Sequence, residues 1–253
     1  MAGHNKWSKI KRQKAVTDAK RSGVFTKIAK EIAVAAKTGG GADPDYNFKL
    51  KTIIAKAKTA GVPKSNIDRA LEKAAGKGEG DDLKEIIYEG YLPGGVAVMV
   101  MTATDNTNRT YADIRTIFNK SSGSIGNSGC VAYMFQKQGQ IKIEKPEDWN
   151  EEKEEELFNI VLDVGGEDLD SSDEEEILLS TPSENFQNIS EAFEKALEAS
   201  SLELKILETK DALVPENSVE VGDEDDAKNI IKAMEAFDDN EDVIDIVANF
   251  EFT

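Results

Sequence analysis

Charge divides the chain into two parts near residue 80. Residues 1–80 contain 18 Lys and Arg against 7 Asp and Glu, a net charge of +11. The remaining residues contain 13 basic and 42 acidic side chains, a net charge of −29 that the whole-chain value of −18 hides. A strongly basic end on an acidic body is expected to present one face to a polyanion and to hold the other away. The pattern therefore predicts oriented binding to nucleic acid or to a ribonucleoprotein.

Composition restricts the class of protein. A chain of 253 residues suits one large domain or two to three small ones, and 39% hydrophobic with 32% charged residues is typical of a soluble globular protein. The longest apolar run, Val96–Met101, is far shorter than the roughly 20 residues of a membrane helix. Met1–Lys14 has no apolar core of a secretory signal. We therefore expect a cytoplasmic protein with no membrane partner.

The residue inventory argues against catalysis. Cys130 is the single cysteine and His4 the single histidine, so an intrachain disulfide and a zinc site built from Cys or from several His are excluded. A Ser-His or Cys-His pair would need His4, which lies in a basic terminus poorly suited to that role. No phosphate-binding or dinucleotide-binding glycine motif is present. We expect a protein that is not an enzyme, with no cofactor, no metal and no small-molecule substrate.

The first 80 residues read as a helical domain. Apolar residues recur at three- and four-residue spacing from Phe25 to Ala36 and again from Leu50 to Ala57, which predicts two amphipathic helices. The Gly39–Gly41 run separates them. Ser65, with Asp68 three residues later, resembles a capping box and predicts the start of a third helix.

The rest of the chain alternates strand and helix patterns. Ile86–Leu92 and Val96–Thr104 predict two strands joined by a turn at Pro93–Gly95, and Asp105 or Asn106 is expected to cap the following helix. The alternation fits split βαβ units. Further strands are predicted at Val131–Phe135, Ile141–Glu144, Glu176–Thr181, Glu203–Val214 and Val243–Phe250, and helices around Leu157–Val164, Phe186–Leu197 and Ala227–Phe237.

A strip of cations dominates the N-terminal segment. Such a dense set neutralises phosphates, although a solvated face is the plain alternative. Trp7, in the same segment, either stacks on a base or anchors a small core. No zinc finger, basic zipper or helix-turn-helix is readable, so the sequence does not support base-specific recognition. The strip consists of Lys6, Lys9, Lys11, Arg12, Lys14, Lys20, Arg21, Lys27 and Lys30.

Two other features have plain and functional readings. Gly123–Gly126 matches the loose GxxG loop with which KH domains clamp a nucleic-acid backbone, but a simple helix-to-strand connection is the preferred reading. The acidic clusters Glu151–Glu156, Asp173–Glu176 and Asp223–Asp226 lack the spacing of a calcium loop. We expect them to be solvated surface that also repels non-specific nucleic acid.

Several segments, in order along nearly the whole chain, together form a family pattern. They are Ala2–Lys11 with Asp18–Arg21 and Phe25–Lys27, then Val62–Ala70, Tyr88–Val98, Asp105–Thr110, Val131–Phe135 and Pro215–Val219. In these segments the chain resembles the YebC/PmpR family, which includes the mitochondrial translational activator of cytochrome c oxidase. Where the family tends to have a basic Asn-Pro-Arg-Leu-Arg stretch, this chain has Asn47-Phe-Lys-Leu-Lys51, which keeps the charge without the arginine geometry.

The resemblance implies an α+β multidomain fold. A basic helical domain, residues 1–80, is followed by two α/β domains of split βαβ, ferredoxin-like type. Residues 139–204 form one of them, inserted in a discontinuous domain of residues 81–138 and 205–253.

The resemblance also implies a non-enzymatic cytoplasmic regulator. Family members are described as DNA-binding transcriptional regulators, and also as ribosome-associated factors that help translation of difficult sequences such as proline runs. The expected partner is therefore DNA, or alternatively rRNA or tRNA on the ribosome. Two alternative functions are an enzyme and a module that docks on an acidic protein. We expect the basic strip to make the contact, with Lys64 and Arg69 secondary. The sequence leaves the oligomeric state open, a monomer included.

Overall fold

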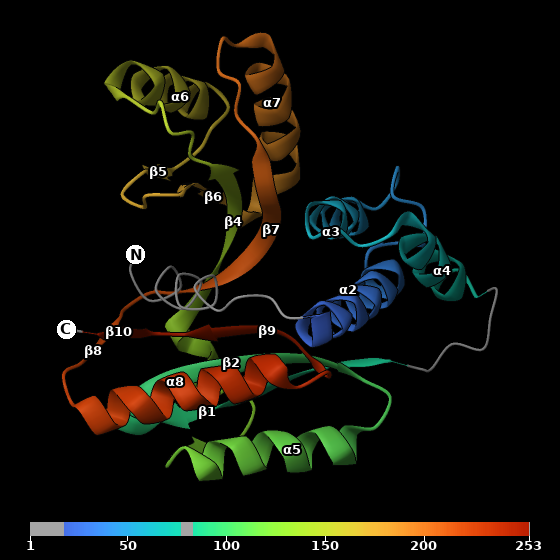
Figure 1. Cartoon of the computed structure of the whole chain (residues 1–253), viewed down its shortest axis with the longest axis vertical. Coiled ribbons are helices and arrows are strands. Elements are labelled where there is room, and N and C mark those ends of the chain that lie inside the picture. Colours follow the sequence, from blue (N-terminus) through green and yellow to red (C-terminus); the bar gives the residue numbers. More distant parts are fainter. Residues whose placement is uncertain (1–17, 77–82, 253) are drawn as a thin grey trace. The chain divides into compact units, whose positions relative to one another are not determined.

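A computed structural model describes residues 18–76 and 83–252, and the side chains from residue 23 onward in the first of these ranges (Figure 1). The described chain is a mixed α+β structure, so the predicted class is confirmed at that level. Backbone contacts group it into two compact units. One unit takes the described residues within 1–53, 62–136 and 214–253, and the other takes 54–61 and 137–213. The division into three domains stays a prediction.

Three helices follow one another in the basic segment: α2 (Asp18–Thr38), α3 (Phe48–Thr59) and α4 (Lys64–Ala74). Their apolar stripes are buried as the three- and four-residue spacing predicts, with Ile32 and Leu50 at 1% and 0% exposure. Ile67 and Ala70 form the buried face of α4, which packs against α2.

Asn47 ties α2 to α3. Its side-chain nitrogen donates to the carbonyl oxygens of Ala35, at 2.9 Å, and Gly41, at 2.7 Å, while its side-chain oxygen accepts from the Leu50 N–H at 3.0 Å. The residue is only 2% exposed. Gly39 passes so close that a Cβ there would lie 2.3 Å from this oxygen, so only glycine fits. One side chain therefore caps a helix and fixes the loop before it.

The first unit contains a four-stranded sheet in the order β3-β1-β2-β9. β1 (Lys84–Leu92) and β2 (Val96–Thr104) pair antiparallel through the Pro93–Gly95 turn, in which Gly94 and Gly95 adopt positive φ. β2 is buried along its whole length, as its continuous apolar sequence predicts. β3 (Ser124–Ile125) borders β1 and β9 (Val243–Ala248) borders β2. β8 (Val219–Val221) and β10 (Phe250–Phe252) form a separate parallel pair.

Helices α5 (Thr107–Lys120) and α8 (Glu224–Asp239) pack against each other and against this sheet. Phe118 and Phe237 meet edge to face with ring centroids 5.0 Å apart, and both are fully buried. β1 lies between β2 and β3 and is antiparallel to both, so β2, α5 and β3 form a split βαβ unit. The core of the unit therefore joins segments more than a hundred residues apart in the chain.

The second unit carries its own four-stranded sheet, in the order β5-β6-β4-β7. Along the chain its elements follow a βαββαβ order, which is that of ferredoxin-like folds. Leu157 of α6 and Phe193 of α7 are fully buried in it. The elements are β4 (Phe135–Glu144), α6 (Glu151–Asp163), β5 (Asp168–Asp170), β6 (Glu176–Pro182), α7 (Phe186–Ala199) and β7 (Ile206–Pro215).

Two local predictions are wrong. Ser65 does not cap α4: the helix begins at Lys64, no side chain caps it, and the Pro63 carbonyl accepts from the N–H groups of Asn66 and Ile67. Residues 131–135 do not form a strand, because a short 3₁₀ helix occupies Ala132–Met134 and β4 starts only at Phe135. The prediction that Asn106 caps α5 is confirmed, since its side chain accepts from the Arg109 N–H at 3.1 Å.

Replacing Asn47 with Ala is expected to lower the free energy of unfolding by about 2–3 kcal/mol, because it removes a helix cap and the hydrogen bonds from a buried side chain to the Ala35 and Gly41 carbonyl groups. Urea unfolding monitored by circular dichroism measures this. Thr59→Ala, an exposed position on the same helix, serves as the control and should change the value by less than about 0.5 kcal/mol. Equal stabilities of the two variants would contradict the assigned role of Asn47.

Candidate nucleic-acid interface

The predicted contact residues fall into three groups. Lys6, Lys9, Lys11, Arg12 and Lys14 lie outside the described residues, as does Trp7. Lys20 and Arg21 lie in the first turn of α2, with side chains outside the description. Lys27, Lys64 and Arg69 are fully described, and only the last two are exposed.

Lys27 and its neighbour Lys30 point into the protein. The Lys27 Nζ donates to the Asp238 carbonyl and lies 3.6 Å from the Asp238 carboxylate, and the lysine side chain is 14% exposed. Lys30 donates to the Glu241 carbonyl at 3.0 Å and to Asp242 Oδ1 at 2.5 Å. These two cations of the strip therefore hold α2 against the last turn of α8 and the segment that follows it.

Asp242 is the centre of this junction. Its Oδ2 accepts from Arg109 Nη2 at 3.0 Å and from the Thr110 hydroxyl at 2.7 Å, while Oδ1 takes Lys30. Arg109 also donates to Asp105 at 2.8 Å. Asp242 is only 5% exposed, and its buried charge is balanced by two cations and hydrogen-bonded by a hydroxyl. The Asp105–Thr110 motif therefore has a structural role here: it caps α5 and receives Asp242.

The ionisation of Asp242 reflects two opposing effects. Burial raises the pKa of its carboxyl, but the hydrogen bonds from Lys30, Thr110 and Arg109 outweigh burial and hold the pKa below its usual range. The same carboxylates, Asp242 and Asp105, raise the pKa of the Arg109 guanidinium. Asp242 and Arg109 are therefore both charged throughout the neutral pH range.

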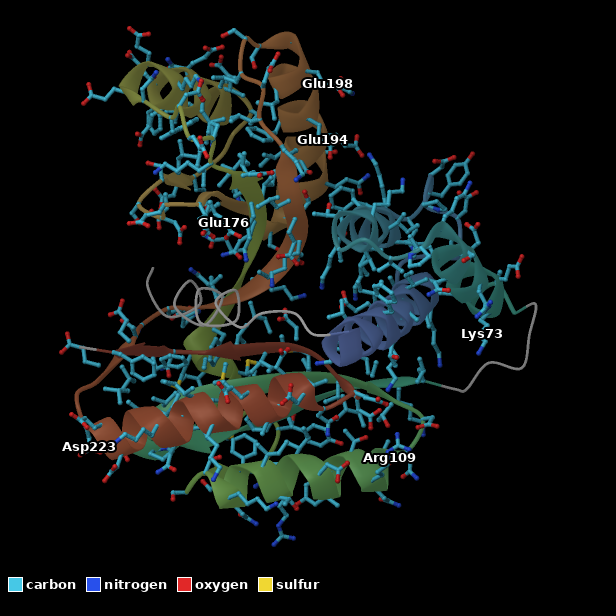
Figure 2. The ribbon with its side chains drawn as sticks, in the orientation of Figure 1. Lys73, Arg109, Glu176, Glu194, Glu198 and Asp223 are labelled. Carbon is cyan, nitrogen blue, oxygen red and sulfur yellow. The ribbon has the colours of Figure 1, made fainter. Side chains whose placement is uncertain are left out.

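A hollow of about 480 Å³ opens beside the junction, and Figure 2 shows Arg109 at that end of α5. Its lining includes the cations Lys30 and Arg109. Four carboxylates face the same space, those of Asp105, Asp113, Glu241 and Asp242. Because acids outnumber bases, this hollow does not suit a phosphate group.

Most exposed cations of the described basic segment lie on α3 and α4 instead. Within residues 18–76 and 83–252, five of these have no ion pair with another described side chain. α4 turns its buried face towards α2 and leaves its cations outside; Figure 2 shows Lys73 on this helix. The five are Lys49, Lys58, Lys64, Arg69 and Lys73.

Glu89 is a buried residue that the sequence analysis missed. Its carboxylate is 4% exposed and accepts from the backbone N–H groups of Gly129, Val131 and Ala132 at 2.6–2.9 Å. It therefore shapes the loop that includes the GxxG sequence, which supports the plain connecting role of that loop. Burial and the nearby Glu89 raise the pKa of the Cys130 thiol, so Cys130 stays protonated and is a poor nucleophile.

The acidic clusters lie on the surface, and two of them stabilise the N-terminus of a helix. Asp223 caps α8 by accepting from the N–H groups of Asp225 and Asp226, and three glutamates occupy the first turn of α6. In the described ranges, no three His, Cys, Asp or Glu side chains gather as metal ligands would. None of the described helices has the length and apolar character needed to cross a membrane.

Comparison with known proteins identifies the family. The profile of the TACO1/YebC N-terminal domain matches residues 5–77, and that of the TACO1/YebC second and third domain matches residues 83–250. A "probable transcriptional regulatory protein" of Syntrophomonas wolfei is 47% identical over 249 residues, covering 98% of this chain and 96% of the relative. One from Clostridium acetobutylicum is 47% identical over 253 residues, covering 100% and 98%.

The fold has a solved counterpart. The crystal structure of a conserved hypothetical protein from Aquifex aeolicus superposes with a TM-score of 0.83 at 39% sequence identity, covering 95% of this chain and 94% of that one. The chain belongs to the TACO1/YebC family, and the predicted resemblance is confirmed.

Asp242→Asn tests the junction. The variant leaves Lys30 without its counter-charge and Arg109 with Asp105 alone, so we expect it to lower the free energy of unfolding at neutral pH by about 2–4 kcal/mol. Because the pKa of Asp242 is lowered in the folded protein, the stabilisation exists above the unfolded value of about 3.9 and is lost as pH falls through the folded pKa. Urea unfolding at several pH values should therefore show the two proteins converging below about pH 4. A gap that stayed constant down to that acidity would contradict the role of the charge.

Proposed function

We propose that this protein is a non-enzymatic nucleic-acid-binding regulator of gene expression that works in the cytoplasm. The observation that carries the proposal is a set of five exposed cations on α3 and α4, which within residues 18–76 and 83–252 have no ion pair with a described side chain: Lys49, Lys58, Lys64, Arg69 and Lys73. Exposed cations without an internal ion pair remain available to bind phosphate oxygens. Each phosphate contact releases a counterion and makes binding steeply dependent on salt.

The proposed interface combines the described cations with the N-terminal strip. Lys64 and Arg69 would act together with Lys6, Lys9, Lys11, Arg12, Lys14, Lys20 and Arg21 as direct phosphate contacts. Lys27, whose amine is bound by Asp238, would act by holding α2 in position. Phosphate contacts position a protein on nucleic acid and carry little sequence information, so we expect weak sequence preference.

The acidic remainder would limit where nucleic acid binds. Residues 139–204 carry 21 acidic and 4 basic side chains, so this part of the chain repels phosphate. We propose that it is a separate inserted domain, which makes the protein one of three domains. Contact would then be confined to the basic segment.

The target class follows from the relatives and stays open to test. The names of the relatives, probable transcriptional regulatory proteins, favour DNA. The alternative is rRNA or tRNA on the ribosome, with a role in translation. An A-form RNA helix and a B-form DNA duplex offer different groove shapes, so relative affinity distinguishes the two.

Lys64→Gln combined with Arg69→Gln tests the interface. Fluorescence anisotropy with a DNA duplex and an RNA hairpin of equal phosphate number, across about 50–200 mM salt, should show weaker binding. For the duplex, the slope of log K against log salt should become shallower by about 0.9 for each lost contact.

Lys195→Gln combined with Lys232→Gln is the matched control, since it removes two exposed cations from α7 and α8. The control should keep the wild-type slope. A wild-type slope in the Lys64/Arg69 variant would contradict the interface. Binding that is tighter to the RNA hairpin than to the duplex would move the target to the translation alternative.

A further inference from the structure

Tyr46 is an unusually exposed aromatic residue beside the proposed interface. It is 85% exposed, compared with 70% for Tyr133, the next most exposed large apolar side chain of those described. Across residues 18–76 and 83–252, no other ring stacks on it and no hydrogen bond holds its hydroxyl. Leaving a ring of this size in water has a cost that a bound partner would recover.

The backbone that carries Tyr46 is fixed on both sides. The Tyr46 N–H donates to the Asp43 carbonyl at 3.2 Å, and the Asp45 N–H donates to the Asp43 carboxylate at 3.0 Å. The next residue is the buried Asn47, with its three hydrogen bonds to α2, the loop and α3. The ring therefore projects from a defined turn, and a tyrosine has only two side-chain torsions to order on binding.

Charge around Tyr46 is asymmetric along the chain. Asp43 and Asp45 precede the ring, and the Asp43 carboxylate already accepts the Asp45 N–H within the turn. Lys49, exposed and without an ion pair to a described side chain, follows within the first turn of α3, and Lys51 comes next on the same helix. A strand that placed a base on the ring would have cations for its phosphates on the α3 side only.

We propose that Tyr46 is a stacking platform for one unpaired nucleobase, with Lys49 binding the adjacent phosphate. The inference rests on the proposed function, because it adds a base contact to an interface otherwise made of phosphate contacts. Stacking uses the π-face that every base has, so it selects unpaired over paired nucleic acid without reading sequence. Paired bases keep their faces inside the duplex, and the carboxylates of Asp43 and Asp45 disfavour a second strand.

The test compares strands with and without bases. Fluorescence anisotropy would measure binding of oligomers of about ten nucleotides: oligodeoxyadenylate, oligoriboadenylate and an abasic deoxyribose-phosphate strand with the same number of phosphates. The wild-type protein should bind the adenine strands about tenfold more tightly than the abasic strand, the range expected for one stacked base. Tyr46→Ala should abolish this difference, leave abasic binding unchanged and keep the salt slope, since no charge is removed.

Two variants control for indirect effects. Tyr46→Phe keeps the ring and should retain the preference for bases, which distinguishes stacking from a hydroxyl contact or a folding defect. Tyr133→Ala removes another exposed tyrosine and should also retain it. The comparison of the RNA and DNA strands shows which sugar the site accepts.

The outcomes separate the two proposals. A preference for bases that is equal in wild type and Tyr46→Ala, or absent from wild type, would overturn the platform and leave the phosphate interface standing. Failure of the wild-type protein to bind any of the strands, the DNA duplex or the RNA hairpin would overturn the proposed function and the platform with it.

Discussion

The buried carboxylate of Asp242 is the interaction on which the arrangement of the first unit depends. It receives Lys30 from α2, and Arg109 and Thr110 from α5, and it lies at the start of β9. Burying this charge without partners would cost several kcal/mol, so the three segments stabilise the fold only when they meet. The junction thereby fixes the basic helix α2 to the four-stranded sheet of the first unit. Lys30 and Arg109 are paired within this junction, although a count of charges in the sequence would make Lys30 available to nucleic acid.

This division changes how the basic segment is understood. Lys27 and Lys30 stabilise the protein, whereas Lys49, Lys58, Lys64, Arg69 and Lys73 stay in solvent. A like-charged set of this kind is tolerated at the surface because water and salt screen it, and a polyanion would neutralise it more completely. The two cations that line the hollow, Lys30 and Arg109, are paired with the carboxylates of Asp242 and Asp105. The residues proposed to contact nucleic acid are therefore the exposed cations of α3 and α4 and those of the N-terminal strip.

Local rules in the sequence predicted the parts of the fold that depend on neighbouring residues. The apolar spacing of α2, the continuous apolar run of β2 and the Asn106 cap are all set within a few residues. The prediction that Ser65 caps α4 was wrong because Pro63, whose carbonyl accepts the first helical hydrogen bonds, starts the helix two residues earlier. The prediction of a strand at Val131–Phe135 was wrong because the carboxylate of Glu89, some forty residues upstream, accepts the N–H groups of Val131 and Ala132. The pairing of Asp242 with Lys30 could not be predicted from local sequence patterns, because 212 residues separate the two. Exposed cations can be counted in the sequence, but which of them are paired can be known only from the fold.

In the proposed interface, nucleic acid contacts the cations of α3 and α4 and avoids the acidic part of the chain. Lysine-selective acylation of the whole protein, read by mass spectrometry with and without a bound DNA duplex or RNA hairpin, tests this proposal. We expect bound nucleic acid to protect Lys49, Lys58, Lys64 and Lys73 from acylation. Lys195, Lys228 and Lys232, exposed on α7 and α8, should react equally in both states. Protection of the α7 and α8 lysines, or unchanged reactivity of the α3 and α4 lysines under conditions where the nucleic acid is bound, would contradict the account.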